Sequence, residues 1–176
     1  MNIGVLLYGP PASGKDTVTA ALSRLDPQFQ LFERLKDGPG RTAGYRKISP
    51  ERFDQLRDSG DLIWTNTRYR ARYAIDRPGL LQLLETGCIP VVHAGQPEVI
   101  GAVVAATPPV SWTVIELQVD RDEAISRITA RATGDFAERI AAWDETPSLT
   151  SPALTIDTTL TSPDAAASLI RSTVCN

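Results

Sequence analysis

Short apolar runs alternate with amphipathic segments along most of this chain. The apolar runs have the length of buried strands and lie at residues 3–8, 89–92, 113–119 and 153–157. Segments with apolar residues at helical spacing are predicted to be helices and lie at residues 17–25, 80–85, 98–106, 120–133, 135–143 and 163–174. Strands that alternate with helices form a parallel sheet, because their crossover connections are right-handed. The pattern therefore predicts an α/β fold with a parallel sheet flanked by helices.

One stretch, residues 34–76, departs from this alternation. Around and within it we expect a short strand at 29–32, a basic, glycine-rich, mobile loop at 36–44, a helix at 51–58, and strands at 61–67 and 69–75. Ser49 and Pro50 support that helix as its N-cap and first-turn residue. The two later strands alternate polar with apolar or aromatic residues, which predicts a small antiparallel insertion.

A glycine-rich loop follows the first apolar run and leads into the first predicted helix. A strand, a glycine-rich turn and a helix N-terminus present backbone N–H groups to one point, which suits an anionic phosphate chain. The spacing of Gly9, Gly14 and Lys15 matches the Walker A loop (P-loop), whose lysine reaches the β- and γ-phosphates of a nucleotide. A glycine-rich turn with a surface lysine is the alternative, but the flanking strand and helix favour phosphate binding. The expected nucleotide-binding residues are Gly9, Pro10, Ala12, Ser13, Gly14, Lys15, Asp16 and Thr17.

The residue after Lys15 departs from the Walker A pattern. That pattern continues with Ser or Thr, whose hydroxyl ligates Mg²⁺. Here Asp16 takes that place, and the hydroxyl comes one residue later, at Thr17. Either Asp16 binds Mg²⁺ directly or Thr17 supplies the ligand, so ATP and Mg²⁺ are the expected cofactors.

Length, charge and the few cysteine and histidine residues limit the domain number, the partners and the kinds of metal site that this chain can have. A chain of 176 residues suits one domain, with a core at 1–33, 77–126 and 150–176, the insertion at about 34–76 and a lid at about 127–145. The net charge of −3 argues against nucleic-acid or membrane partners, although basic residues concentrate between Arg34 and Arg77 and indicate a local anion site. Two isolated cysteines, and an N-terminus that starts directly into a strand, favour a reduced, cytoplasmic protein. The single histidine, His93, excludes a histidine-cluster metal site.

In the order of these parts, the chain resembles the guanylate-kinase branch of the P-loop nucleoside-monophosphate kinases. The loop, the basic segment, the stretch from Tyr45 to Phe53, the insertion and a paired-helix lid carry the resemblance. It implies that Arg34, Arg41 and Tyr45 hold the acceptor phosphate, with Tyr73 as a further phosphate-facing residue. A disordered basic loop is the alternative for this segment.

The chain departs from that family where guanine would be recognised. Trp64 stands where the family has its guanine-binding glutamate, Ile75 replaces a base-contacting serine, and no acidic residue ends the strand before Gln96. GMP is therefore doubtful as the acceptor. The ribose 1,5-bisphosphokinases are similar in these respects, because they also lack the guanine-binding glutamate and the acidic strand end. Their loop also reads Gly-Lys-Asp. Trp64 could stack on a different base or shape a sugar pocket.

Three arginines are the expected lid residues. Arg127 and Arg131 are spaced i, i+4, and Arg139 follows a hinge near Thr133 and Gly134, so closure could bring all three over the phosphates. With Lys15 they are the expected catalytic residues, which would stabilise charge on the transferring phosphoryl group. A solvated helix face paired with Glu123 and Glu138 is the alternative for Arg127 and Arg131.

The function expected is ATP-dependent transfer of a γ-phosphate to a small phosphorylated acceptor, most simply a nucleoside monophosphate other than GMP. A sugar-phosphate kinase and a non-catalytic nucleotide-binding module remain open, as does a kinase acting on a free hydroxyl. The last would need a general base, for which Asp16, His93 and Asp157 are the candidates. Monomer and homodimer are both compatible with the sequence.

Overall fold

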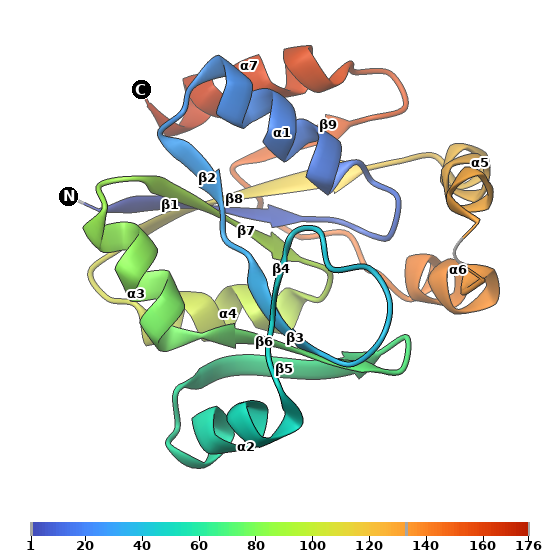
Figure 1. Cartoon of the computed structure of the whole chain (residues 1–176). Coiled ribbons are helices and arrows are strands. Elements are labelled where there is room, and N and C mark those ends of the chain that lie inside the picture. Colours follow the sequence, from blue (N-terminus) through green and yellow to red (C-terminus); the bar gives the residue numbers. More distant parts are fainter. Residues whose placement is uncertain (1, 133, 176) are drawn as a thin grey trace.

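The core of the computed structural model, which describes residues 2–132 and 134–175, is a five-stranded parallel sheet (Figure 1). Its strands run in the order β2 (Phe29–Leu31), β7 (Ile89–Ala94), β1 (Ile3–Tyr8), β8 (Ser111–Gln118) and β9 (Leu154–Asp157). Every neighbouring pair is parallel. The predicted α/β class and its core strands are confirmed.

Helices cover both faces of this sheet because its central strand is apolar on both sides. Val5 and Leu7 of β1 pack into one core, and Leu6 and Tyr8 pack into the other. Helices α1 (Lys15–Leu25) and α7 (Pro163–Val174) cover the first face. Helices α3 (Arg77–Glu85) and α4 (Pro97–Ala106) cover the second. None of the helices in the described ranges is long and apolar enough to cross a membrane.

A second sheet of four strands lies beside the second face. Its order is β4 (Tyr45–Lys47), β3 (Arg34–Asp37), β6 (Ala71–Asp76) and β5 (Leu62–Arg68). The insertion was expected to be antiparallel, but β3 pairs parallel with β4, so the sheet is mixed. The reason is the connection at residues 38–44, which brings the chain back to the start of β3 before β4 begins. Helix α2 (Pro50–Asp58) covers one face through Phe53 and Leu56.

One basic residue is buried where the sequence predicted an exposed loop. Lys36 and Asp37 belong to β3, and Lys36 is only 3% exposed. The buried ammonium is stabilised because it donates a hydrogen bond to the carbonyl oxygen of Arg41 at 2.8 Å and lies against two tyrosine rings. The prediction of a mobile loop from the basic, glycine-rich composition was therefore wrong for Lys36 and Asp37.

Two short helices follow β8 at the carboxyl-end edge of the core sheet (Figure 1). Helix α5 (Arg121–Arg131) starts at its N-cap Asp120, which accepts a hydrogen bond from the backbone N–H of Asp122 at 2.9 Å. It ends before the predicted position because Ala132 adopts a left-handed conformation. Of the expected hinge, Thr133 lies outside the described residues and Gly134 has a φ of +79°. Helix α6 (Phe136–Asp144) follows.

Candidate active site

A cavity of about 590 Å³ opens where the predicted phosphate-binding loop (residues 9–14), the four-stranded second sheet (the insertion sheet) and helix α6 meet. Most of the residues predicted from the sequence line it: Gly9, Ala12, Ser13, Gly14, Lys15 and Asp16 from the loop, Arg34, Arg41, Tyr45, Trp64 and Tyr73 from the insertion, and Arg131 and Arg139 from the lid. Pro10, Thr17 and Arg127 are not among its lining residues. Three segments far apart in the sequence therefore form one site.

The loop after β1 has the backbone of an anion-binding turn. Gly14 takes the left-handed N-cap position of α1 with a φ of +88°, and no side chain caps the helix. The first N–H groups of α1 are thus left for a ligand. At Gly9 the loop runs against β8, since a Cβ there would lie 2.4 Å from the carbonyl oxygen of Leu117. The glycine is required by this close approach.

Lys15 folds back over the loop. Its Nζ donates hydrogen bonds to the carbonyl oxygens of Gly9 at 2.5 Å and Pro10 at 2.9 Å. Burial lowers the pKa of Lys15 to about 7; the carboxylate of Asp16 opposes this shift, and the cations Arg34 and Arg131 add to it. Phosphate oxygens are stronger acceptors for an ammonium group than carbonyl oxygens are. We therefore expect a bound phosphate to hold the charged form of this lysine.

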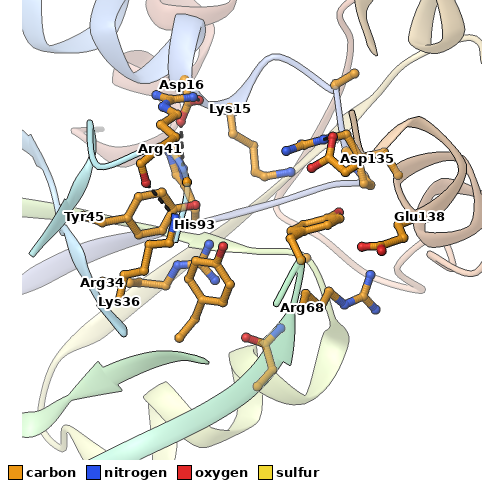
Figure 2. A pocket seen from close by; sticks show the side chains of 18 of the residues that line it. Lys15, Asp16, Arg34, Lys36, Arg41, Tyr45, Arg68, His93, Asp135 and Glu138 are labelled. Carbon is orange, nitrogen blue, oxygen red and sulfur yellow. Dashed lines mark hydrogen bonds and ion pairs between the residues drawn. The ribbon is translucent and has the colours of Figure 1, made fainter. Parts of the chain in front are cut away.

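Asp16 faces a cation from the insertion. Its Oδ2 accepts a hydrogen bond from Arg41 Nη1 at 2.9 Å, and its Oδ1 lies 3.6 Å from Nδ1 of His93 (Figure 2). Burial alone would raise the pKa of Asp16, but nearby cationic groups, among them the Arg41 guanidinium, outweigh it and hold the pKa below its usual value. Both members of the Asp16–Arg41 pair are about half exposed, so we assign the pair only about 0.2–1 kcal/mol.

His93 is a packed polar residue at the end of β7. It is 9% exposed, and its Nε2 lies 2.8 Å from the Oγ1 of Thr19. Burial and the nearby charge of Lys15 lower its pKa to about 3, so the imidazole is neutral at pH 7. This matches the expectation of a hydrogen-bonded residue at the end of a strand.

Two tyrosines and two cations form a cluster on the insertion wall. The ring centroids of Tyr45 and Tyr73 are 5.4 Å apart. Arg34 Cζ lies 5.8 Å from each centroid, and Lys36 Nζ lies 5.6 Å from each. Strand pairing sets this up, because Arg34 lies opposite Tyr45 and Lys36 opposite Tyr73. Within the described chain the Arg34 side chain has no hydrogen bond or ion pair, and it lines the cavity, so its guanidinium is available to an anion.

Alternate residues of β5 continue this wall. Trp64, Asn66 and Arg68 all line the cavity, and Asn66 pairs with Tyr73 across the sheet. Sequence reasoning identified Trp64 but missed Asn66, Arg68 and the buried Lys36. The period-two alternation of this strand could have identified Asn66 and Arg68. None of the three cavity-facing positions on β5 carries a carboxylate.

The three lid arginines have different surroundings. Arg131 lines the cavity and, among the described residues, its side chain forms no hydrogen bond or ion pair. Arg139 Nε donates to Oδ1 of Asp135 at 2.7 Å, and its Cζ lies 4.7 Å from the centroid of the Tyr69 ring. Helix α6 thus touches the turn between β5 and β6.

Arg127 lies behind the phosphate-binding loop. Its Nη1 donates to the carbonyl oxygen of Ala12 at 3.1 Å, and its Nη2 donates to that of Thr158 at 2.9 Å. Its Nε donates to Oε1 of Glu123 at 2.8 Å, the helix-face pair considered as the alternative. The geometry makes Arg127 a support of the loop.

The described residues contain no group of three or more His, Cys, Asp or Glu side chains that could hold a metal ion. The cavity instead offers the loop carboxylate of Asp16, whereas Thr17 is exposed outside the lining. Mg²⁺ in nucleotide sites is commonly bound through one or two carboxylates together with substrate phosphates and water. The residues present fit a nucleotide-bound Mg²⁺ held by Asp16.

Comparisons with known proteins bear on the fold. No family model matches the sequence, and no curated protein matches it significantly. Among solved structures, a guanylate kinase from Anaplasma phagocytophilum is similar with a TM-score of 0.62 and 12% identity, covering 99% of this chain and 85% of that one. The protein APE1195 is similar with a TM-score of 0.61 and 19% identity, covering 99% and 95%. A sugar kinase from Janibacter sp. HTCC2649 has a TM-score of 0.57 and 14% identity, covering 98% and 94%. The chain therefore has the fold of the P-loop kinases.

Proposed function

We propose that this protein is an ATP-dependent phosphotransferase that moves a γ-phosphate to a small phosphorylated acceptor. One observation carries the proposal: a single cavity has the phosphate-binding loop with Lys15 on one wall and the Arg34–Tyr45–Tyr73 cluster on another. Two anion sites in one cavity suit a reaction between two phosphate groups. The cytoplasmic setting expected from the sequence belongs to the same proposal.

Positioning and charge neutralisation account for most of the catalysis of phosphoryl transfer. The loop N–H groups and Lys15 hold the donor phosphates, and Asp16 holds Mg²⁺, which when bound neutralises charge on those phosphates. Arg131 and Arg139 line the same cavity, and their role in the proposal is to stabilise charge on the transferring group. Arg34 binds the acceptor phosphate. That phosphate is already a nucleophile, so the reaction needs no general base and leaves His93 bound to Thr19.

The acceptor proposed is a nucleoside monophosphate other than GMP. Trp64, Asn66 and Arg68 face the cavity from β5, and no carboxylate among them meets the two adjacent donor groups of a guanine edge. Strong selection for a polar edge requires a site built to hydrogen-bond it, so a site without this carboxylate has lost the means of selecting guanine. Trp64 offers an aromatic surface on which a base can stack.

A sugar bisphosphate is the second candidate. Its support is the charge of the acceptor wall, where Lys36, Arg41 and Arg68 line the cavity in addition to Arg34. One phosphate does not need four cations, whereas an acceptor with two phosphates would use them. The loop sequence Gly14-Lys15-Asp16, shared with ribose 1,5-bisphosphokinases, points the same way.

The proposal is tested by ADP formation from Mg·ATP against nucleoside monophosphates, deoxynucleotides and ribose 1,5-bisphosphate. Turnover with one acceptor, lost in Lys15→Ala with the fold retained, supports a kinase and identifies its substrate. Tight Mg·ADP binding without turnover on any acceptor would favour a non-catalytic nucleotide-binding module.

A further inference from the structure

We propose that Arg41 and the nucleotide-bound Mg²⁺ are alternative partners of the Asp16 carboxylate, so that metal binding releases Arg41 to the acceptor phosphate. This inference rests on the proposed function and adds to it a coupling between the two halves of the site. Its basis is the ion pair between Asp16 Oδ2 and Arg41 Nη1 at 2.9 Å, which joins helix α1 to the insertion (Figure 2).

The loop that carries Arg41 is tied to the acceptor cluster as well. The carbonyl oxygen of Arg41 accepts a hydrogen bond from Lys36 Nζ at 2.8 Å, and Lys36 lies against both Tyr45 and Tyr73. The Arg41 side chain itself points to Asp16 and donates from Nε to the carbonyl oxygen of Ala43 at 3.1 Å. Residue 41 thus has its backbone at the acceptor wall and its guanidinium at the metal position.

The two cations compete for the same oxygen atom. Oδ1 of Asp16 lies 3.6 Å from Nδ1 of His93, and Oδ2 is the oxygen that Arg41 contacts. A divalent ion beside that oxygen repels the guanidinium. The pair exchanges readily, because the Asp16 and Arg41 side chains are 45% and 53% exposed and water competes for both.

Release of Arg41 has a thermodynamic consequence. If Mg·nucleotide binding frees a cation for the acceptor phosphate, it raises the affinity for the acceptor. Acceptor binding must then raise the affinity for Mg·nucleotide by the same factor. Without metal, Arg41 stays on Asp16 and the acceptor site lacks one of its cations. The aspartate in place of the usual serine or threonine then has a role that a hydroxyl cannot perform, since a neutral group would not hold Arg41.

The first test measures the magnesium effect, defined as the ratio of the ADP dissociation constant in EDTA to that in Mg²⁺, by calorimetry. Arg41→Gln should raise this ratio on the order of tenfold, because the metal no longer displaces a guanidinium. In the Asp16→Asn background, Arg41→Gln should change it by less than about threefold. Arg70→Gln, which removes another cavity-lining arginine that has no contact with Asp16, controls for general charge.

An equal rise in both backgrounds would show a through-space charge effect and overturn the proposal, as would no rise at all. Thermal melts of each variant establish that the fold is intact before the ratios are compared.

The second test uses inorganic phosphate as a probe of the acceptor wall while ADP occupies the loop. Phosphate should bind on the order of tenfold more tightly with Mg²⁺ and ADP than with ADP and EDTA. In Asp16→Asn the two affinities should agree within about threefold. Equal affinities in the unmodified protein would overturn the release of Arg41. Neither test needs turnover. If the protein is an active kinase but both tests fail, only this inference is overturned and the proposed function stands.

Discussion

Arg127 and Thr158 join the phosphate-binding loop to the end of the last core strand. Nη2 of Arg127 donates to the Thr158 carbonyl oxygen at 2.9 Å, and Nη1 donates to the Thr158 hydroxyl oxygen at 3.1 Å. Nη1 also reaches the carbonyl oxygen of Ala12 within the loop. Thr158 is buried, so these acceptors have little access to water without the guanidinium. Arg127 therefore holds two loops together at the back of the site.

Replacing Arg127 by Gln should lower the free energy of unfolding by about 1–3 kcal/mol, because buried acceptors lose their donor. Urea denaturation measures the loss. Arg131→Gln, four residues along the same helix, is the control and should stay within about 0.5 kcal/mol of the unmodified protein. If Arg127→Gln kept its stability but lost turnover, Arg127 would act in catalysis, as expected from the sequence.

Replacing Arg131 by Ala should lower kcat on the order of a hundredfold, the usual effect of removing one donor to the charge that develops in a transition state. ADP affinity should change little, because ground-state phosphates are held by the loop. Steady-state kinetics and calorimetry separate the two effects. A loss of ADP affinity as large as the loss in kcat would mean that Arg131 binds the donor in the ground state.

Replacing Gly9 by Ala should damage the phosphate-binding loop, since the new Cβ would lie 2.4 Å from the Leu117 carbonyl oxygen. Overpacking of this kind costs about 1–3 kcal/mol, and the displaced loop should lose ADP binding. The matched control is Gly95→Ala, which also lines the cavity but has open space around its Cβ. Equal ADP affinities in the two variants would contradict the expected close approach at position 9.

Replacing Arg34 by Gln should raise the KM for the acceptor about 10–100-fold, because a charge-assisted hydrogen bond to phosphate is lost. The KM for ATP should be unaffected. Arg52→Gln on α2, outside the cavity lining, provides the charge-matched control. An acceptor KM that stays constant in Arg34→Gln would move the acceptor phosphate away from the Tyr45–Tyr73 cluster.

The pKa of Lys15, lowered by burial to about 7, predicts how nucleotide binding depends on pH. Above pH 7 the free protein holds a neutral lysine, which must be protonated when phosphate binds. ADP affinity should therefore fall by up to about tenfold per pH unit above pH 7, relative to Lys15→Arg, whose guanidinium stays charged. Calorimetry from pH 6 to 9 measures the two profiles, and parallel profiles would contradict the lowered pKa.

The same shift sets the sign of the stability change of the ligand-free protein. The pKa of Lys15 in the folded protein lies below the 10.5 of an unperturbed lysine, so between these two values the unfolded chain binds more protons. Stability should rise as the pH increases from 7 towards 10.5. Lys15→Met, which has no titrating group, should lack this contribution in urea denaturation over the same pH range.

Local sequence signals were sufficient for the core. The buried strand β1, the glycine spacing of the following loop and the Ser49 cap of α2 each depend on residues within a few positions of one another. Ser49 accepts from the backbone N–H of Arg52 at 3.2 Å, as the sequence predicted. Such patterns encode element type and placement without knowledge of the rest of the fold.

Contacts between distant segments could not be predicted in this way. Lys36 was predicted to be in an exposed loop. Its burial could not be predicted locally, because it depends on the rings of Tyr45 and Tyr73, which only strand pairing brings together. Arg127 and Arg131 have the same helical spacing and charge, but one meets Thr158 and the other faces the cavity. That difference depends on where the end of β9 lies relative to α5.

The alternation of side chains on the insertion sheet separates two kinds of position. Arg34 and Tyr73 face the cavity, whereas their chain neighbours Leu35 and Ala74 are packed with Phe53 of α2. Substitutions on the cavity side leave that packing against α2 intact. During evolution such a sheet can change the chemistry of one side while the packing of its other side against α2 is kept. Laboratory redesign of acceptor choice can follow the same route.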